Sequence, residues 1–141
     1  MITVSLVCTV HNEMGRANVS ELLAILERIQ PEVIFLEVPA ATFGDYYENF
    51  SQQNLESKAV GQYREGHQVK LVPVDLPNPT GDFFSNFDEL CRRIRQISAE
   101  YRRLMQLDDD RTREHGLDFL NSEDCGELWA RVYEDILSSI K

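Results

Sequence analysis

Three short apolar runs alternate with segments of helical spacing, and this order restricts the fold more than any other feature of the chain. The runs cover residues 2–10, 32–38 and 69–75, and the first is uncharged and rich in β-branched side chains. Such runs are typical of strands that are buried on both faces of a parallel sheet. Strands that alternate with helices favour right-handed crossovers. We therefore expect an α/β fold with three layers, α/β/α, around a small and mainly parallel sheet.

The expected helices of the first half have recognisable ends. Asn18 is a candidate N-cap because Glu21 follows three residues later, and Pro31 stops the helix that begins there. Residues 40–66 hold aromatic and polar side chains that roughly follow helical spacing, so we expect mostly helix there.

Long helices are expected in the second half. Apolar side chains recur at three- and four-residue intervals over residues 84–107, which predicts one long amphipathic helix. The highly charged residues 107–116 are expected to form a connector. A last helix should begin after Asn121 or Ser122, because either side chain can cap it.

Length and composition favour a single domain over residues 1–141. The chain has 141 residues, of which 43% are hydrophobic, and this is enough for one core. The apolar stripe of the last helix still runs at Lys141. We therefore expect a longer natural chain of which these residues are the N-terminal part.

The charge of the chain limits its partners. With 24 acidic and 14 basic side chains, the formal net charge is −10. Such a surface repels phosphate backbones and anionic lipid, so we expect neither nucleic acid nor a membrane as partner. An alternative interpretation is that the acidic surface only keeps the protein soluble. The sequence leaves a homo-oligomer open as a further alternative.

The cysteines and apolar runs indicate a compartment. Cys8, Cys91 and Cys125 are an odd number without a C-x-x-C pair, which favours a reducing environment. No apolar run approaches the roughly 20 residues that span a bilayer, and the first residues lack the features of a signal peptide. We expect a cytoplasmic protein.

An ionisable side chain lies at the end of each expected strand. His11 follows the first, Glu37 ends the second and Asp75 follows the third. Because the carboxyl ends of parallel strands meet at one edge of a sheet, these three side chains are expected to share a crevice. They have the donor types for a divalent cation, and His11 or Glu37 could instead act as a general base on water.

Each of these residues also has a structural interpretation. His11 could cap the strand, Glu37 could pair with a helix N-terminus or an arginine, and Asp75 could be an ordinary turn acid. His67 and His115 are interpreted as surface residues. Cys8 is interpreted as a small buried apolar residue.

Three stretches carry a resemblance to a known family. They are CTVH at residues 8–11, PEVIFLEVP at residues 31–39 and VPVD at residues 72–75. With the helix between the first two, this pattern resembles the TraB, ChaN and erythromycin-esterase-like superfamily over about the first 77 residues. In that family a G-x-x-H motif closes strand one and an acid closes strand two.

The resemblance maps the family histidine onto His11 and the acid onto Glu37, and Asp75 matches a frequent acid after strand three. Cys8 stands where the motif has glycine, and no second G-x-x-H motif is found. Known members include metal-dependent peptidases, esterases that open macrolide rings, and haem or iron binders. The resemblance therefore implies a kind of site and leaves the reaction open.

The leading hypothesis is a hydrolase-like domain that acts on an ester or amide bond of a small molecule or peptide. His11 and Glu37 would be catalytic, and His11, Glu37 and Asp75 would hold a divalent metal such as manganese, zinc or cobalt. The alternative is a non-catalytic domain that binds a small ligand, haem or a partner protein in the same crevice.

Overall fold

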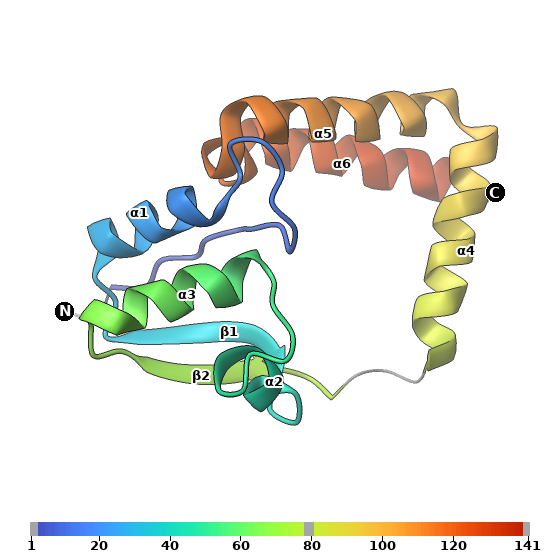
Figure 1. Cartoon of the computed structure of the whole chain (residues 1–141). Helices are drawn as coiled ribbons and strands as arrows, with labels where there is room; N and C mark the ends of the chain where they lie inside the picture. Colours follow the sequence, from blue (N-terminus) through green and yellow to red (C-terminus); the bar gives the residue numbers. More distant parts are fainter. Residues whose placement is uncertain (1–2, 78–80, 140–141) are drawn as a thin grey trace. The chain divides into compact units, whose positions relative to one another are not determined.

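The computed structural model of the protein describes residues 3–77 and 81–139 (Figure 1). Within these residues the chain divides into two compact units. The expectation of a single domain over residues 1–141 stays a prediction. The sheet unit consists of residues 10–13 and 18–77, and the helical unit consists of residues 3–9, 14–17 and 81–139.

The sheet unit is a mixed helix and strand structure around two parallel strands. Val33 lies opposite Lys70 and Phe35 opposite Val72, in parallel register. The expected strands 32–38 and 69–75 are thereby confirmed, together with a small parallel sheet in an otherwise helical chain. The elements, in chain order, are α1 (Val19–Ile29), β1 (Val33–Pro39), α2 (Phe43–Tyr47), α3 (Leu55–Gly66) and β2 (Lys70–Asp75).

Helices cover one face of this sheet. Figure 1 shows α1 and α3 on the same side of the two strands. Leu36 of β1 is only 5% exposed, whereas its neighbour Phe35, which points to the other face, is 65% exposed. Because successive side chains of a strand point to opposite faces, this difference separates a covered face from an open one. The described residues of the sheet unit therefore form two layers.

Side-chain caps define the helices of the sheet unit. The expected cap is confirmed, because the Asn18 side-chain oxygen accepts a hydrogen bond of 3.0 Å from the backbone N–H of Glu21. At the start of α3, Asn54 and Ser57 each accept a hydrogen bond from the other's backbone N–H, at 2.8 and 3.0 Å. This capping box begins a new helix, so the helix expected over residues 40–66 is split into α2 and α3.

The strand expected over residues 2–10 is wrong for residues 3–10, which form no strand; residue 2 lies outside the described residues. Val4 is 83% exposed and Leu6 is 88% exposed. The backbone of Cys8 is bonded instead to the side chain of Asn121, which accepts from the Cys8 N–H at 2.7 Å and donates to the Cys8 carbonyl at 3.0 Å. Strand propensity depends on a pairing neighbour, and a single side-chain amide does not extend into a ladder.

The helical unit contains three long helices and one contiguous core. No helix within the described residues is long and apolar enough to cross a bilayer. The helices are α4 (Gly81–Ile97), α5 (Ala99–Leu120) and α6 (Glu123–Ser139). The buried core consists of Ile94, Tyr101, Leu104, Phe119, Cys125, Leu128 and Val132.

The single helix expected over residues 84–107 is wrong, because the chain breaks between α4 and α5. The hydroxyl oxygen of Ser98 accepts a hydrogen bond of 3.0 Å from the Tyr101 N–H and so caps α5. The charged residues 107–116, expected as a connector, belong to α5. The expected start of α6 is confirmed, since the Ser122 hydroxyl accepts a hydrogen bond of 3.2 Å from the backbone N–H of Cys125.

A kink in α5 forms the attachment point of an early loop. Gly116 has non-helical backbone angles, φ 64° and ψ −142°. The carbonyl of Arg113, which would accept from residue 117 in a straight helix, accepts a hydrogen bond of 2.9 Å from the Arg16 N–H. Gly15 beside it has φ +58°, and a Cβ atom there would come within 3.0 Å of the Arg113 backbone. The contact therefore requires glycine.

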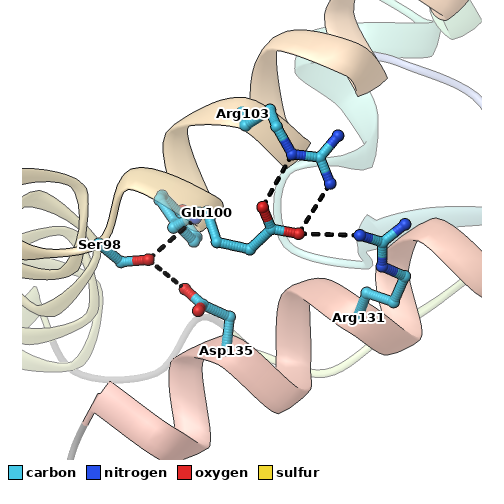
Figure 2. A network of polar contacts seen from close by, with 6 residues as sticks. Ser98, Glu100, Arg103, Arg131 and Asp135 are labelled. Atoms are coloured by element: carbon cyan, nitrogen blue, oxygen red, sulfur yellow. Dashed lines mark hydrogen bonds and ion pairs between the residues drawn. The ribbon is translucent and has the colours of Figure 1, made fainter.

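Polar contacts join α5 to α6 (Figure 2). Glu100 of α5 accepts hydrogen bonds from Arg103 on the same helix and, at 2.8 Å, from Arg131 on α6. The hydrogen bonds from Arg103, assisted by Arg131, lower the pKa of Glu100 to about 2. Ser98 donates to Asp135 of α6 at 2.6 Å, so the residue that caps α5 also contacts the neighbouring helix.

Candidate functional site

The backbone of His11 contacts the first residue of α3, and His11 does not follow a strand. Its carbonyl oxygen accepts a hydrogen bond of 2.8 Å from the N–H of Leu55, the first residue of α3. The backbone of the histidine is therefore attached to the N-terminal turn of a capped helix. This contact places His11 in the sheet unit, beside side chains that are more than forty residues away in sequence.

The imidazole of His11 pairs with the carboxylate of Glu56. His11 Nδ1 lies 3.1 Å from Glu56 Oε1, and the side chains are 69% and 19% exposed, respectively. An ionised carboxylate only accepts hydrogen bonds, so the neutral ring that fits this contact carries its proton on Nδ1. The other ring nitrogen, Nε2, then has a lone pair on an exposed ring. This is the arrangement of a histidine that can take a proton from a bound molecule.

The position of Glu56 follows from the cap of α3. It lies in the first turn, between the two residues of the capping box, Asn54 and Ser57. A carboxylate is favoured there by the partial positive charge of a helix N-terminus. The same carboxylate affects the pKa of Tyr47. Burial raises the pKa of Tyr47 to about 12, and the charge of Glu56 contributes to this shift. The Tyr47 hydroxyl therefore stays protonated at neutral pH.

Glu37 and Asp75 occupy exposed positions. Glu37 lies on the open face of β1, between the buried residues Leu36 and Val38, so its carboxylate meets solvent. The carboxylate of Asp75, at the end of β2, accepts a hydrogen bond of 2.8 Å from the N–H of Leu76. This contact fits the interpretation of Asp75 as a turn acid.

His11, Glu37 and Asp75 do not form a metal-binding cluster in this structure. Within residues 3–77 and 81–139, no group of three or more His, Cys, Asp or Glu side chains could hold a metal ion. The residues present, including His11, Glu37 and Asp75, thus do not fit a metal site in this arrangement, and no step through a metal is derived from it. The assignment of these three residues as ligands stays a prediction that rests on the resemblance.

Glu56 was not among the residues singled out from the sequence. The signal that could have located it is the pattern Asn54-Leu-Glu-Ser57, a capping box that starts a helix and places an acid in its first turn. Its contact with His11 spans 45 residues of sequence, and no periodicity indicates such a pair.

The other two histidines have local roles. His67 stacks on Tyr63 with ring centroids 4.1 Å apart, and its Nε2 lies 3.4 Å from Glu27. His67 follows α3 as its C-cap and its side chain is 33% exposed, so it is a surface residue with one packed side. His115 is exposed and pairs with its neighbour Glu114 at 3.7 Å.

A broad depression lies beside α3, and the histidine of the candidate site is not part of it. It has a volume of about 820 Å³ and is lined by residues that include Tyr47, Phe50, Ser57, Lys58 and Arg64. Its volume is within the roughly 300–1,000 Å³ of small-molecule sites. The sheet unit therefore offers a reactive pair and, separately, a concave surface.

Comparisons with known proteins add no family. No family model matches this chain, and no curated protein or solved structure matches it. The resemblance to the TraB, ChaN and erythromycin-esterase-like superfamily thus stays a prediction based on the motifs at residues 8–11, 31–39 and 72–75.

Proposed function

We propose that the sheet unit is a hydrolase-like domain in which His11 acts as general base toward an ester or amide bond and Glu56 positions its ring. The observation that carries the proposal is the 3.1 Å contact between His11 Nδ1 and Glu56 Oε1, with the histidine exposed and the acid mostly covered. A carboxylate partner holds an imidazole in one tautomer and stabilises the imidazolium that forms during proton transfer.

The proposed reaction needs only water and the substrate. Nε2 of His11 accepts a proton from water while the water oxygen forms a bond to the carbonyl carbon, whose π electrons move to the carbonyl oxygen. The tetrahedral intermediate collapses and breaks the C–O or C–N bond. The departing oxygen or nitrogen takes the proton back from Nε2, which releases an acid and an alcohol or amine. Glu56 stays ionised throughout.

The test compares turnover of chromogenic esters and peptide amides by the full chain and its variants. His11→Ala should lower kcat/KM by roughly 10²–10⁴-fold, the usual contribution of a general base. Glu56→Gln should lower kcat by at least about 10-fold with KM unchanged, and should alter the pH profile, because a neutral amide does not stabilise the imidazolium. His115→Ala, a change at an exposed histidine of the helical unit, is the matched control.

Two outcomes would count against this assignment. One is undiminished activity of the His11→Ala chain, and the other is no turnover of any ester or amide by the parent chain. Glu37→Gln separates the two versions of the site: a loss of activity supports the acid that the resemblance implies, and full activity supports Glu56 alone.

The second candidate is a non-catalytic binding domain, and the depression beside α3 favours it. That surface includes the exposed ring of Phe50 together with two basic and two acidic side chains, which suits a ligand with an apolar body and polar groups. The charged residues are Glu48, Lys58, Arg64 and Glu65. Calorimetric titration of the parent chain with haem, manganese and zinc distinguishes the candidates. Tight uptake of haem without hydrolysis supports binding as the function.

We also propose the three-layer form of the α/β fold, with a further helical layer over the open face of the sheet. Parallel sheets are normally covered on both faces, and the open face here carries the exposed apolar side chains of Val33, Phe35 and Val74. An experimental structure with this face open to solvent would contradict the proposal.

A cytoplasmic location is proposed as well. It is supported by three free cysteines, Cys8, Cys91 and Cys125, which a reducing compartment preserves. The net charge of −10 supports small-molecule or peptide partners over nucleic acid or anionic membrane. Recovery of the protein with membranes or secreted material after cell fractionation would contradict this location.

A further inference from the structure

Two free thiols line one depression of the helical unit. This depression, of about 400 Å³, is formed at the corner between α5 and α6, and its lining includes Cys8, Asn121, Cys125 and Trp129. Cys8 is exposed, so its interpretation as a buried apolar residue is wrong. Cys125 is 7% exposed and belongs to the core. The depression thus has one thiol that solvent reaches and one that is largely covered.

The side chains of two neighbouring residues, Asn121 and Ser122, bond to the backbone of the two cysteines. Asn121 holds the N–H and the carbonyl of Cys8 and also donates at 2.8 Å to the carbonyl of Leu117 in α5. One residue later, Ser122 caps α6 through the N–H of Cys125. Asn121 and Cys125 are about one helical turn apart, so the Asn121 contacts hold the backbone of Cys8 near the first turn that carries Cys125.

We propose that Cys8 and Cys125 are a redox-reactive thiol pair that reacts with small disulfides such as oxidised glutathione. Cys8 is the attacking thiol because it is exposed, so a disulfide in solvent can reach its sulfur atom. Cys125 is the resolving thiol. The depression, of about 400 Å³, is in the range of small-molecule sites and can hold one glutathione half of the disulfide beside Cys8.

The reaction is two successive thiol–disulfide exchanges. The Cys8 thiolate attacks one sulfur of oxidised glutathione, the S–S bond breaks, and one glutathione leaves as thiolate and takes a proton. The Cys125 thiol then loses its proton and attacks the Cys8 sulfur, and the second glutathione leaves in the same way. The protein loses two thiol hydrogens and gains one S–S bond, and one oxidised glutathione becomes two reduced ones.

The surroundings of the two thiols support this order. Burial raises the pKa of the Cys125 thiol, with smaller contributions from the charges of Asp108 and Cys8. A thiol with a raised pKa reacts slowly with a solvent disulfide, but a disulfide formed on its neighbour acts at high effective concentration.

The proposed disulfide would add a covalent bond between residues 3–8 and α6. In the reduced protein the described backbone contacts of Cys8 are the two bonds to Asn121, and Val4 and Leu6 are exposed. A bond from Cys8 to Cys125 would tie this segment covalently to α6. The oxidised chain should then unfold at a higher temperature, because the cross-link removes conformations from the unfolded state.

The test exposes the full chain to oxidised glutathione and maps its disulfides by mass spectrometry of unreduced digests. A monomeric product in which Cys8 is linked to Cys125 is expected, with a rise in Tm that dithiothreitol reverses. Cys125→Ser should stop at a mixed disulfide between Cys8 and glutathione. Cys91→Ser, which changes the third thiol, should cross-link like the parent chain.

Cys8→Ser keeps the test decisive even if a change at the buried Cys125 impairs folding, because Cys8 is exposed. In this variant Cys125 should stay reduced. The proposal is overturned if oxidation joins Cys91 or two separate chains instead, or if the link between Cys8 and Cys125 forms no faster in the folded chain than in urea.

Discussion

The sheet unit and the helical unit use charge in different ways. In the sheet unit the carboxylate of Glu56 is mostly covered and contacts an exposed histidine, His11. In the helical unit the carboxylate of Glu100 is at the surface, between two arginines that lower its pKa to about 2. Surface ion pairs such as those of Glu100 contribute little to stability. A mostly covered carboxylate beside an exposed imidazole can instead determine which ring nitrogen carries the proton.

The two units also differ in how their cores are arranged. The helical unit packs seven buried side chains into one cluster, which includes Leu104. The sheet unit buries residues of α1 and α3 against one face of two strands, with Leu55 almost fully covered. Each unit therefore has buried apolar residues of its own, which is the requirement for a separate unfolding transition.

Matched core truncations should show this separation most strongly. Leu104→Ala and Leu55→Ala each remove a side chain that is at most 1% exposed, and each should cost about 2–5 kcal/mol. The only tryptophan, Trp129, lies in α6 and reports the helical unit by fluorescence. In urea, Leu104→Ala should shift the fluorescence transition, and Leu55→Ala should instead increase amide hydrogen exchange in α1 and α3.

An equal shift of the Trp129 fluorescence transition by both truncations would show that the two units unfold as one. Circular dichroism of each variant before urea is added serves as the control for a folded starting state.

A pair of glycine substitutions should give the next largest contrast. Gly15→Ala should destabilise the helical unit by about 2 kcal/mol or more, because an alanine there needs a left-handed backbone and overlaps Arg113. Gly66→Ala, at the end of α3, meets no atom within 4 Å and should be neutral or slightly stabilising. Midpoints of urea unfolding, measured for both variants, check the pair, and equal midpoints would contradict the described contact at Gly15.

In the sheet unit, alkali should act through the hydroxyl group of Tyr47. Tyr47 has a pKa of about 12 in the folded chain against an ordinary value of 10.0, so the unfolded chain loses this proton first. Its contribution is fully present below pH 10 and disappears as the pH rises through 12, a loss of at most about 3 kcal/mol. Tyr47→Phe should make stability less dependent on pH over this interval, which urea titrations at several pH values would measure.

Local patterns of the sequence were sufficient for the capped elements. The Asn18 cap, the start of α6 and the strands 32–38 and 69–75 each depend on neighbouring residues, and the structure confirms them. The prediction of a strand from the first apolar run was wrong for a physical reason. β-branched residues favour a strand only when another strand pairs with them, and a run of local sequence does not show whether such a strand is present.

The charged stretch of α5 and the candidate site show the same limit. Residues 107–116 were expected to be a connector because they are polar, yet Thr112 within them is buried and the stretch is helical, with Gln106 bonded to Asp110 one turn later. For the site, His11 could be selected from the sequence, but its partner could not. The contact with Glu56 depends on how residues 10–13 meet α3, which only the folded chain determines.

The helical unit takes residues 3–9 and 14–17 from the start of the chain and residues 81–139 from much later. During translation the ribosome releases every described segment of the sheet unit before it releases α4. The early loop around Gly15 must therefore wait, without its partner at Arg113, until α5 has emerged. A pause in synthesis once residue 77 has left the ribosome would leave a nascent chain with every described segment of the sheet unit and an exposed apolar leading segment, the kind of surface that chaperones bind.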